Sequence, residues 1–226
     1  MPILTDFQKK IIAIASETPS VKEKFWLAGG TALAEFYLQH RLSEDLDFFT
    51  DQREEFRAAI RDFEETTAKK HLAVTKTYDG NTFARFIFFN EAEPLKVEFC
   101  WDSPYRFQPT TNSEYGIRLE NPVDIACNKL SALYDRYAPK DFVDGYFIHR
   151  EMHNLDDLIC WSKQKHGGMD NYMLAVAFKA VDQIPDDSPL FPRMLKPLDK
   201  KDMRETFLKY AVRLIREPFE ARPYSQ

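Results

Sequence analysis

The hydrophobic pattern of this chain changes its period near residue 120, and that change limits the folds open to it. Before this point, residues 71–78, 82–90 and 95–101 alternate apolar and polar side chains as strands do. Asp79-Gly80-Asn81 lies between the first two and is typical of a hairpin turn. From Pro122 onward the apolar residues recur with helical spacing almost to the end. The chain is therefore predicted to be an α+β protein, with a mixed sheet in residues 1–120 and an all-helical region in residues 121–226.

The remaining elements follow from shorter patterns. We expect short strands at residues 25–28, 46–50 and 116–119, the last of them at an edge of the sheet. The expected helices are residues 4–16, 31–39, 51–70, 123–134, 140–151, 155–165, 171–184 and 201–216. Thr5 and Asp6 are candidate N-caps of the first helix, and Pro122 suits a first helical position.

The composition excludes several classes of protein. With 44% hydrophobic residues, 19 Phe and only 7 Gly among 226 residues, the chain is expected to fold around a sizeable core. Its net charge of -5 argues against a protein that coats nucleic acid indiscriminately. No apolar run reaches the ~18 residues of a membrane-spanning helix, and the cysteines have neither metal-site nor disulfide spacing. We therefore expect a cytoplasmic protein without a membrane partner.

Two carboxylates two residues apart are the first candidate for chemistry. Asp45 and Asp47 fall at the start of a predicted strand, where alternate side chains leave the same face. Carboxylates this close repel each other unless a cation lies between them, and Mg²⁺ or Mn²⁺ prefers such oxygen ligands. We expect Leu46, Phe48 and Phe49 to anchor the other face of the strand in the core. The alternative is a solvated strand end, where Asp is common.

A glycine-rich turn precedes this pair. Gly29 and Gly30 follow a short apolar strand, and Thr31 opens the predicted helix. Glycines there let the backbone approach a phosphate closely, and the free N–H groups at a helix start bind anions. The alternative is an ordinary strand-to-helix turn with Thr31 as N-cap. A phosphate-binding turn followed by a metal-binding pair predicts nucleotidyl transfer.

A third acid lies in the predicted strand at residues 95–101. Glu98 shares one face of that strand with Lys96, and a carboxylate among large apolar residues requires a cation. If the sheet places it beside the aspartate pair, Glu98 would complete a metal site and accept the proton of an attacking hydroxyl. Two alternatives stay open. Glu98 pairs with Lys96 or Arg85 on an exposed sheet face, or Asp102 is the third acid.

The helical region contributes a candidate phosphate ligand and a candidate ion-pair network. Lys129 and Arg136 are seven residues apart and so lie on nearly the same helix face. Asp141 and Asp144 fall about one turn apart at the start of the next helix. For Lys129 we expect contact with a triphosphate, because its ammonium is a flexible point charge. For Arg136 and Asp144 we expect an interhelical network in which Arg136 pairs with Asp141 or Asp144.

In this order, the motifs resemble the signature of the AbiEii/AbiGii-type nucleotidyltransferases of the polymerase-β-like superfamily. The resemblance lies in Gly29-Gly30-Thr31-Ala-Leu33, in His40-Arg41-x-Ser43-x-Asp45-Leu-Asp47-Phe-Phe49, in Lys96-Val-Glu98-Phe, and in the segment from Asp124 to Asp144. These are the family's opening blocks, its third-acid strand, and its lysine helix with the Arg and Asp residues that follow. The match extends over residues 25–150.

The resemblance implies a polymerase-β-like fold and transfer of NMP from an NTP, dependent on Mg²⁺ or Mn²⁺. It implies metal binding by Asp45, Asp47 and Glu98, with Glu98 where the family commonly has Asp. Nucleotide contacts would come from Gly29, Gly30, Thr31, Ser43 and Lys129, with support from Arg41, Lys96, Arg136, Asp141 and Asp144. Members are often toxins of toxin–antitoxin or phage-defence pairs, so an RNA acceptor such as tRNA and a cognate antitoxin are the expected partners. The alternatives are transfer to protein or small-molecule hydroxyls, and a catalytically weakened nucleotide-binding module.

Overall fold

The computed structural model describes residues 3–91, 93–216 and Tyr224, and the chain divides into two compact units. The first unit comprises the described residues up to Tyr37 together with Ser43–Asn121. The second comprises Leu38–Leu42 together with the described residues from Pro122 onward. The helical pattern therefore begins where the main part of the second unit begins. The membership of Leu38–Leu42 was not predicted, because a five-residue segment has no periodicity of its own.

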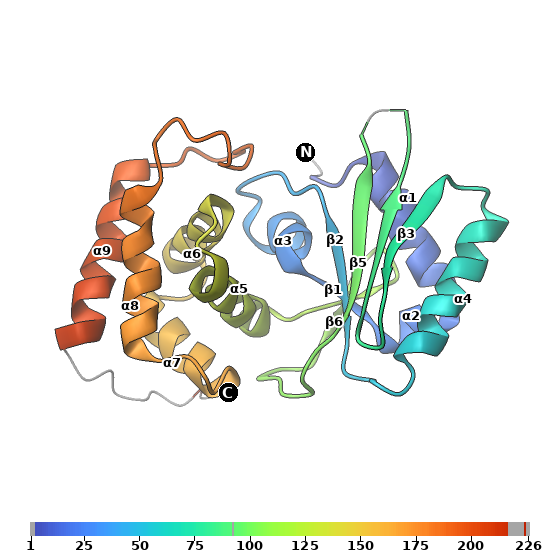
Figure 1. Cartoon of the computed structure of the whole chain (residues 1–226), viewed down its shortest axis with the longest axis horizontal. Helices are drawn as coiled ribbons and strands as arrows, with labels where there is room; N and C mark the ends of the chain where they lie inside the picture. Colours follow the sequence, from blue (N-terminus) through green and yellow to red (C-terminus); the bar gives the residue numbers. More distant parts are fainter. Residues whose placement is uncertain (1–2, 92, 217–223, 225–226) are drawn as a thin grey trace. The chain divides into compact units, whose positions relative to one another are not determined.

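The first unit contains a mixed sheet in the order β3-β4-β5-β2-β1-β7-β6 (Figure 1). Its strands are β1 (Trp26–Ala28), β2 (Leu46–Thr50), β3 (Val74–Asp79), β4 (Phe83–Phe88), β5 (Leu95–Trp101), β6 (Thr111–Asn112) and β7 (Arg118–Leu119). Strand β2 runs parallel to β5 and antiparallel to β1, and β1 runs parallel to β7. The mixed sheet agrees with the predicted α+β class. The predicted edge position of residues 116–119 is wrong, because β7 lies between β1 and β6, which is too short to show an alternating pattern.

Of the helices predicted in the first unit, the one at residues 4–16 is confirmed, the one at residues 51–70 begins only at Phe56, and a helix at residues 19–24 was not predicted. The helices of this unit are α1 (Asp6–Glu17), α2 (Pro19–Lys24), α3 (Gly29–Ala32), the π-helix η1 (Leu33–Leu38) and α4 (Phe56–Lys69). Thr5 caps α1, exchanging hydrogen bonds with Gln8 in a capping box. The single α-helix predicted at residues 31–39 is wrong. The chain turns into α3 at Gly29, which has a positive φ of 70°, and continues as a π-helix from Leu33.

Helix α4 covers one face of the sheet and leaves the other face for the candidate site. Phe63 of α4 lies with its ring centroid 5.6 Å from that of Phe86, 6.2 Å from that of Phe88 and 4.8 Å from that of Phe99. These three sheet residues are all buried, and helices α1 and α2 lie beside α4 (Figure 1). Residues that alternate with them, such as Glu98, therefore leave the sheet on the face opposite to α4.

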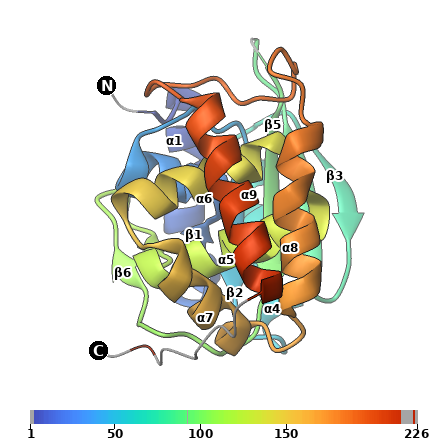
Figure 2. The same cartoon turned by 90° about the vertical axis from the view of Figure 1, so that its left-hand side faces the viewer.

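The second unit is a helical bundle. Its elements are α5 (Pro122–Arg136), α6 (Pro139–Glu151), α7 (Leu155–Lys165), α8 (Asn171–Lys179), the 3₁₀ helix η2 (Ala180–Gln183) and α9 (Lys200–Arg216). Helices α8 and α9 lie side by side (Figure 2). Phe207 of α9 packs with its ring centroid 5.1 Å from Phe142 of α6 and 5.1 Å from Phe178 of α8. The helical prediction for this region is confirmed, except that the helix at residues 171–184 ends as η2. Among the described residues, no helix combines the length and the apolarity required to cross a membrane.

Candidate active site

The pairing of β2 with β5 brings two of the predicted acids together. These strands are parallel, and their register sets Asp47 directly beside Glu98. Leu46 and Phe48 are fully buried on the α4 side of the sheet, so Asp47 leaves on the other face. Phe49 lies on the Asp47 face by the same alternation, which corrects its predicted place among the core anchors. Two acids that are 51 positions apart in the chain thus share one face.

Lys96 joins Asp45 to Glu98. It lies two residues before Glu98 on β5 and therefore on the same face. Its ammonium nitrogen is 3.0 Å from Oδ2 of Asp45 and 3.3 Å from Oε2 of Glu98. Burial alone would lower the pKa of Lys96, but the hydrogen bond and negative charge of Asp45, together with the charge of Glu98, raise it. Lys96 is therefore a stable cation between two of the three predicted metal ligands.

Arg85 holds the other oxygen of Glu98. It faces Glu98 across the antiparallel pair β4–β5, and its Nε lies 2.6 Å from Oε1 of Glu98. Burial would raise the pKa of Glu98, but the hydrogen bond from Arg85 and the charge of Lys96 outweigh it and lower the pKa. The predicted alternative, a pairing of Glu98 with Lys96 or Arg85, is thus present for both cations, and Glu98 lies beside Asp47 as well. Asp102 follows the end of β5 and accepts the N–H of Ser103 at 2.7 Å.

Gly29 allows the carboxylate of Asp47 to lie against the backbone of the glycine turn. A Cβ atom at this position would lie only 2.0 Å from Oδ2 of Asp47, and the φ of 70° independently disfavours any other residue. The first glycine of the turn therefore has a role that the sequence did not predict. It makes room for a candidate metal ligand.

Thr31 positions Asp45 through a hydrogen bond to its backbone. Thr31 is fully buried, and its hydroxyl donates a hydrogen bond to the backbone carbonyl of Asp45. The alternative in which Thr31 caps the helix is therefore wrong, since α3 has already begun at Gly29. Its side chain supports Asp45, and its predicted contact with phosphate, like that of the buried Gly30, stays a prediction. The loop before Asp45 is anchored to α1 by a hydrogen bond, in which Gln8 Nε2 donates to the carbonyl of Ser43 at 2.9 Å.

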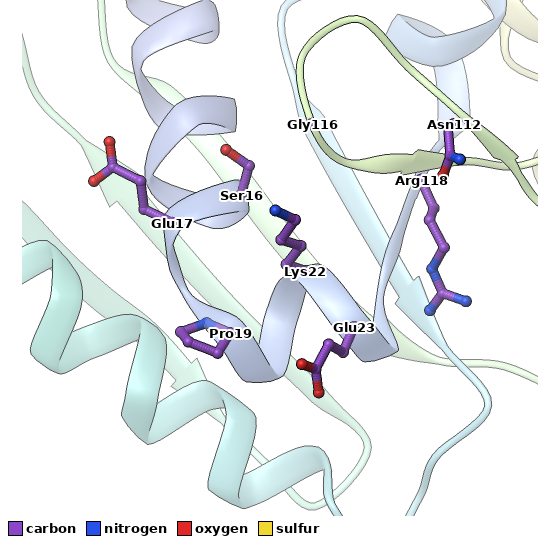
Figure 3. A pocket seen from close by; sticks show the side chains of 8 residues that line it. All are labelled: Ser16, Glu17, Pro19, Lys22, Glu23, Asn112, Gly116 and Arg118. Atoms are coloured by element: carbon purple, nitrogen blue, oxygen red, sulfur yellow. The ribbon is translucent and has the colours of Figure 1, made fainter.

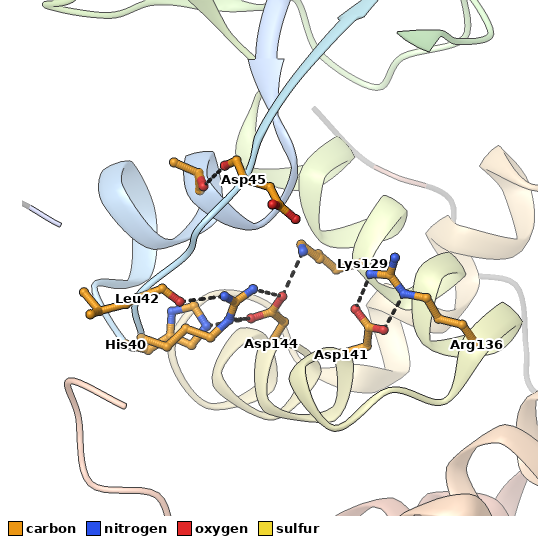
Figure 4. A network of polar contacts seen from close by, with 9 residues as sticks. His40, Leu42, Asp45, Lys129, Arg136, Asp141 and Asp144 are labelled. Carbon is orange, nitrogen blue, oxygen red and sulfur yellow. Dashed lines mark hydrogen bonds and ion pairs between the residues drawn. The ribbon is translucent and has the colours of Figure 1, made fainter. Parts of the chain in front are cut away.

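The second unit contains a buried polar cluster around Asp144, formed by His40, Arg41, Lys129 and Asp144 (Figure 4). Arg41 binds both oxygens of Asp144, with Nε 2.6 Å from Oδ1 and Nη2 2.8 Å from Oδ2. His40 Nε2 lies 2.8 Å from Oδ1, and Lys129 Nζ lies 2.9 Å from Oδ2. We call this group the Asp144 cluster. Burial would raise the pKa of Asp144, but the charges of Lys129 and Arg41, together with the hydrogen bonds of Arg41 and His40, hold it well below its usual range.

The Asp144 cluster changes what was predicted for three residues. Asp144 belongs to an ion-pair network as predicted, but its partners are Arg41 and Lys129. The predicted pairing of Arg136 with Asp141, one of two alternatives, is confirmed at 2.6 and 2.7 Å (Figure 4). Lys129 was expected to contact phosphate and is here ion-paired with Asp144, so its nucleotide role stays a prediction. Arg41 was predicted to support nucleotide binding; it is buried in this cluster, and its nucleotide role likewise stays a prediction. No local signal could have shown the pairing of Arg41 with Asp144, because the two residues are 103 positions apart.

The carboxylates suit a divalent metal by their chemistry, although they are not pre-arranged around one. Among the described residues, no three His, Cys, Asp or Glu side chains are grouped as a ready metal site. The oxygens of Asp45 and Glu98 nevertheless converge on a single cation, the ammonium of Lys96. Mg²⁺ and Mn²⁺ prefer oxygen ligands, so these residues fit such an ion once the ammonium of Lys96 moves out of the position between Asp45 and Glu98.

A separate hollow of about 530 Å³ lies in the first unit between α1, α2 and the β6–β7 segment (Figure 3). It is lined by Ser16, Glu17, Pro19, Lys22, Glu23, Asn112, Gly116 and Arg118. None of the predicted site residues lines it. Both signs of charge line it, so its walls do not select the charge of a ligand.

The chain is similar to known proteins over most of its length. The family described as Nucleotidyl transferase AbiEii toxin, type IV toxin–antitoxin system, matches residues 13–217. The uncharacterized protein aq_aa25 of Aquifex aeolicus (strain VF5) is 32% identical over 157 residues, which are 65% of this chain and 68% of the relative. Two solved structures have a similar fold at low identity. JHP933 from Helicobacter pylori has 19% identity and a TM-score of 0.55, covering 91% of this chain and 88% of that one. A candidate nucleotidyltransferase from H. pylori has 17% identity and a TM-score of 0.60, covering 94% and 96%.

The family match defines the class of the protein, which is a nucleotidyltransferase. Within that class, the chain belongs to the AbiEii nucleotidyl transferase toxin family of type IV toxin–antitoxin systems. The resemblance found in the motifs at residues 25–150 is thereby confirmed, and the family match continues into the helical region as far as residue 217.

Proposed function

We propose that this nucleotidyltransferase transfers an NMP from an NTP to a hydroxyl of an RNA acceptor, with tRNA as the first candidate, and uses Mg²⁺ or Mn²⁺. The observation that carries the proposal is that Asp47 lies beside Glu98 in the sheet, while Asp45, one residue before β2, shares the ammonium of Lys96 with Glu98. When bound, such a metal would neutralise carboxylate and phosphate charge and lower the pKa of the attacking hydroxyl.

The surroundings of Glu98 support a role as ligand more than as a strong base. Its pKa is lowered because Arg85 and Lys96 outweigh the effect of burial, so the carboxylate is ionised throughout the neutral range. A carboxylate with a lowered pKa accepts a proton less readily. Arg85 has a side chain that is 42% exposed, and its guanidinium can also meet an incoming phosphate.

Rigid support holds the two aspartates in position. Asp47 lies against the backbone of Gly29, and the carbonyl of Asp45 accepts the hydroxyl of the buried Thr31. Reacting groups that are held in place avoid the entropy of finding their geometry, and a misplacement of 1 Å can cost on the order of 100-fold in rate. These supports therefore suit a site in which positioning and charge do most of the catalysis, as in nucleotidyl transfer.

Lys129 is proposed to contact the triphosphate. An ammonium has three donors, so its pairing with Asp144 leaves capacity for a phosphate oxygen. The proposal also includes a toxin role with a cognate antitoxin protein, which the family name supports. Expression of the wild-type chain alone should then arrest growth, and expression of Asp47→Asn should not.

A labelling experiment tests the transfer. Purified protein is incubated with each α-³²P-labelled NTP, total RNA and Mg²⁺, and the products are separated on a denaturing gel. We expect RNA to be labelled by the wild type and by Asp187→Asn, an exposed aspartate used as control, and not by Asp47→Asn. EDTA should stop the labelling, and Mn²⁺ should restore it.

The outcomes separate the parts of the proposal. Label that persists in Asp47→Asn would reject the assignment of the site. Label that appears on protein or on a small molecule, with RNA unlabelled, would keep the transfer and reject RNA as the acceptor. Binding of NTP to the wild type without any labelled product, measured by calorimetry, would indicate a weakened nucleotide-binding module.

A further inference from the structure

Lys96 occupies the position between Asp45 and Glu98 that a metal ion would need. The two carboxylate oxygens lie 3.0 and 3.3 Å from its ammonium nitrogen. The second oxygen of Glu98 is held by Arg85 at 2.6 Å, so both oxygens of this acid are paired with protein cations. A metal ligated by Asp45 and Glu98 and the ammonium of Lys96 would stand at the same oxygens, and two cations so close repel each other.

We infer that Lys96 is a built-in counter-cation of the nucleotide-free protein, and that metal enters the site only by displacing it. This inference rests on the proposed function, since it concerns the same three acids. Lys96 is a positioning residue. It keeps two mutually repelling carboxylates side by side before the metal arrives, which lowers the reorganisation needed when it does.

The charges around the site favour displacement by a divalent ion that binds together with the nucleotide. Lys96 pairs with Asp45 and Glu98, and Arg85 pairs with Glu98. These three charged pairs together with Asp47 comprise three acids and two bases, which carry a net charge of minus one. Exchange of the Lys96 ammonium for a divalent ion would make the group neutral. The released ammonium has three donors and a flexible stem, so it can then meet the negatively charged phosphates of the NTP. Metal and NTP should therefore bind with positive cooperativity that depends on Lys96.

Binding of Mn²⁺, followed by electron paramagnetic resonance of the free ion, tests the inference without a measurement of activity. The variant is Lys96→Met, which keeps the length of the side chain and removes its charge. We expect the Kd for Mn²⁺ alone to fall by about tenfold or more, because a cation adjacent to the ligands is removed. A non-hydrolysable NTP analogue should tighten Mn²⁺ binding strongly in the wild type and much less in Lys96→Met.

Lys76 supplies a matched control, and Lys96→Arg supplies a second variant. Lys76 is also held by two carboxylates, at 2.8 Å from Glu64 and 2.8 Å from Asp79, but neither acid belongs to the candidate site. Lys76→Met should therefore leave the Kd for Mn²⁺ unchanged. Lys96→Arg keeps the charge and should also keep the weak metal binding of the wild type. In thermal unfolding, Mn²⁺ should raise the Tm of Lys96→Met more than that of the wild type.

Three outcomes decide the matter. Mn²⁺ binding that is equal or weaker in folded Lys96→Met than in the wild type overturns the counter-cation role, while the RNA-labelling experiment can still support the proposed function. Tighter binding in Lys96→Arg as well as in Lys96→Met overturns it too, since charge would then be irrelevant. Mn²⁺ binding that survives in Asp45→Asn places the metal elsewhere and overturns both this inference and the proposed metal site.

Discussion

The acid face of the sheet, formed by Asp47, Lys96 and Glu98 with Asp45 beside them, contains side chains similar to those of the Asp144 cluster, but in different surroundings. Asp45 and Lys96 have side chains that are 31% and 34% exposed, whereas Asp144 and Lys129 are 0% and 8% exposed. Water screens the first set of pairs, so they can separate at a modest cost in free energy. The second set cannot separate without leaving a charge in a medium of low polarity. The comparison teaches that burial, more than residue type, separates an exchangeable site from a structural cross-link.

Removal of the charge at Asp144 gives the largest expected effect on stability. Asp144→Asn leaves Arg41 and Lys129 buried without their counter-ion, which should lower the free energy of unfolding by about 3–5 kcal/mol. Urea denaturation followed by circular dichroism measures the change. Asp141→Asn is the control, since its partner Arg136 has a side chain that is 51% exposed and stays hydrated when the acid is neutralised. An Asp144→Asn protein as stable as Asp141→Asn would contradict the structural role of the cluster.

Gly29→Ala tests the acid face by displacing one ligand. The new Cβ would lie 2.0 Å from Oδ2 of Asp47, so either Asp47 or the turn must move. We expect the rate of nucleotidyl transfer to fall by about 100-fold or more. Gly167→Ala serves as control, because a Cβ there meets nothing within 4 Å. Unchanged transfer by a folded Gly29→Ala protein would show that the position of Asp47 is not critical.

Lys129→Met asks whether a residue of the buried cluster also serves the nucleotide. Loss of one charged hydrogen bond to phosphate should raise the KM for NTP by about tenfold to a hundredfold. Stability should fall less than in Asp144→Asn, because Asp144 keeps Arg41 and His40 as partners. The exposed Lys140→Met is the control. A normal KM together with a loss of stability would confine Lys129 to the structural network.

The pH dependence of stability gives the smallest expected effect. The pKa of Glu98 is lowered from 4.5, so the stability it contributes is fully present above about pH 4.5 and is lost as the pH falls through its lower folded pKa. Between pH 6 and pH 3 the wild type should therefore lose more stability than Glu98→Gln, with parallel behaviour above pH 6. Thermal unfolding in a series of buffers measures this. Equal acid sensitivity of the two proteins would mean that Glu98 does not hold its ion pairs in solution.

Most of the elements could be predicted from the sequence, because each depends on residues near one another. The alternation in β5 set Lys96 and Glu98 on one face, and Thr5 and Pro122 marked the starts of α1 and α5 correctly. The elements without such a signal were missed. Strand β6 has two residues, and the π-helix η1 has the composition of an ordinary helix. The segment Leu38–Leu42 was missed as well, since its place follows from contacts with residues far along the chain.

The candidate site shows the same division. The sequence supplied its acids, its glycine turn and the order of its motifs, because backbone sterics and side-chain chemistry act over a few residues. The tertiary structure decided that Asp47 lies beside Glu98, that Lys96 bridges two of the acids, and that Lys129 pairs with Asp144. Such partners are selected by strand register and by the cost of burying a charge. Both depend on the packing of the whole chain, which no local pattern records.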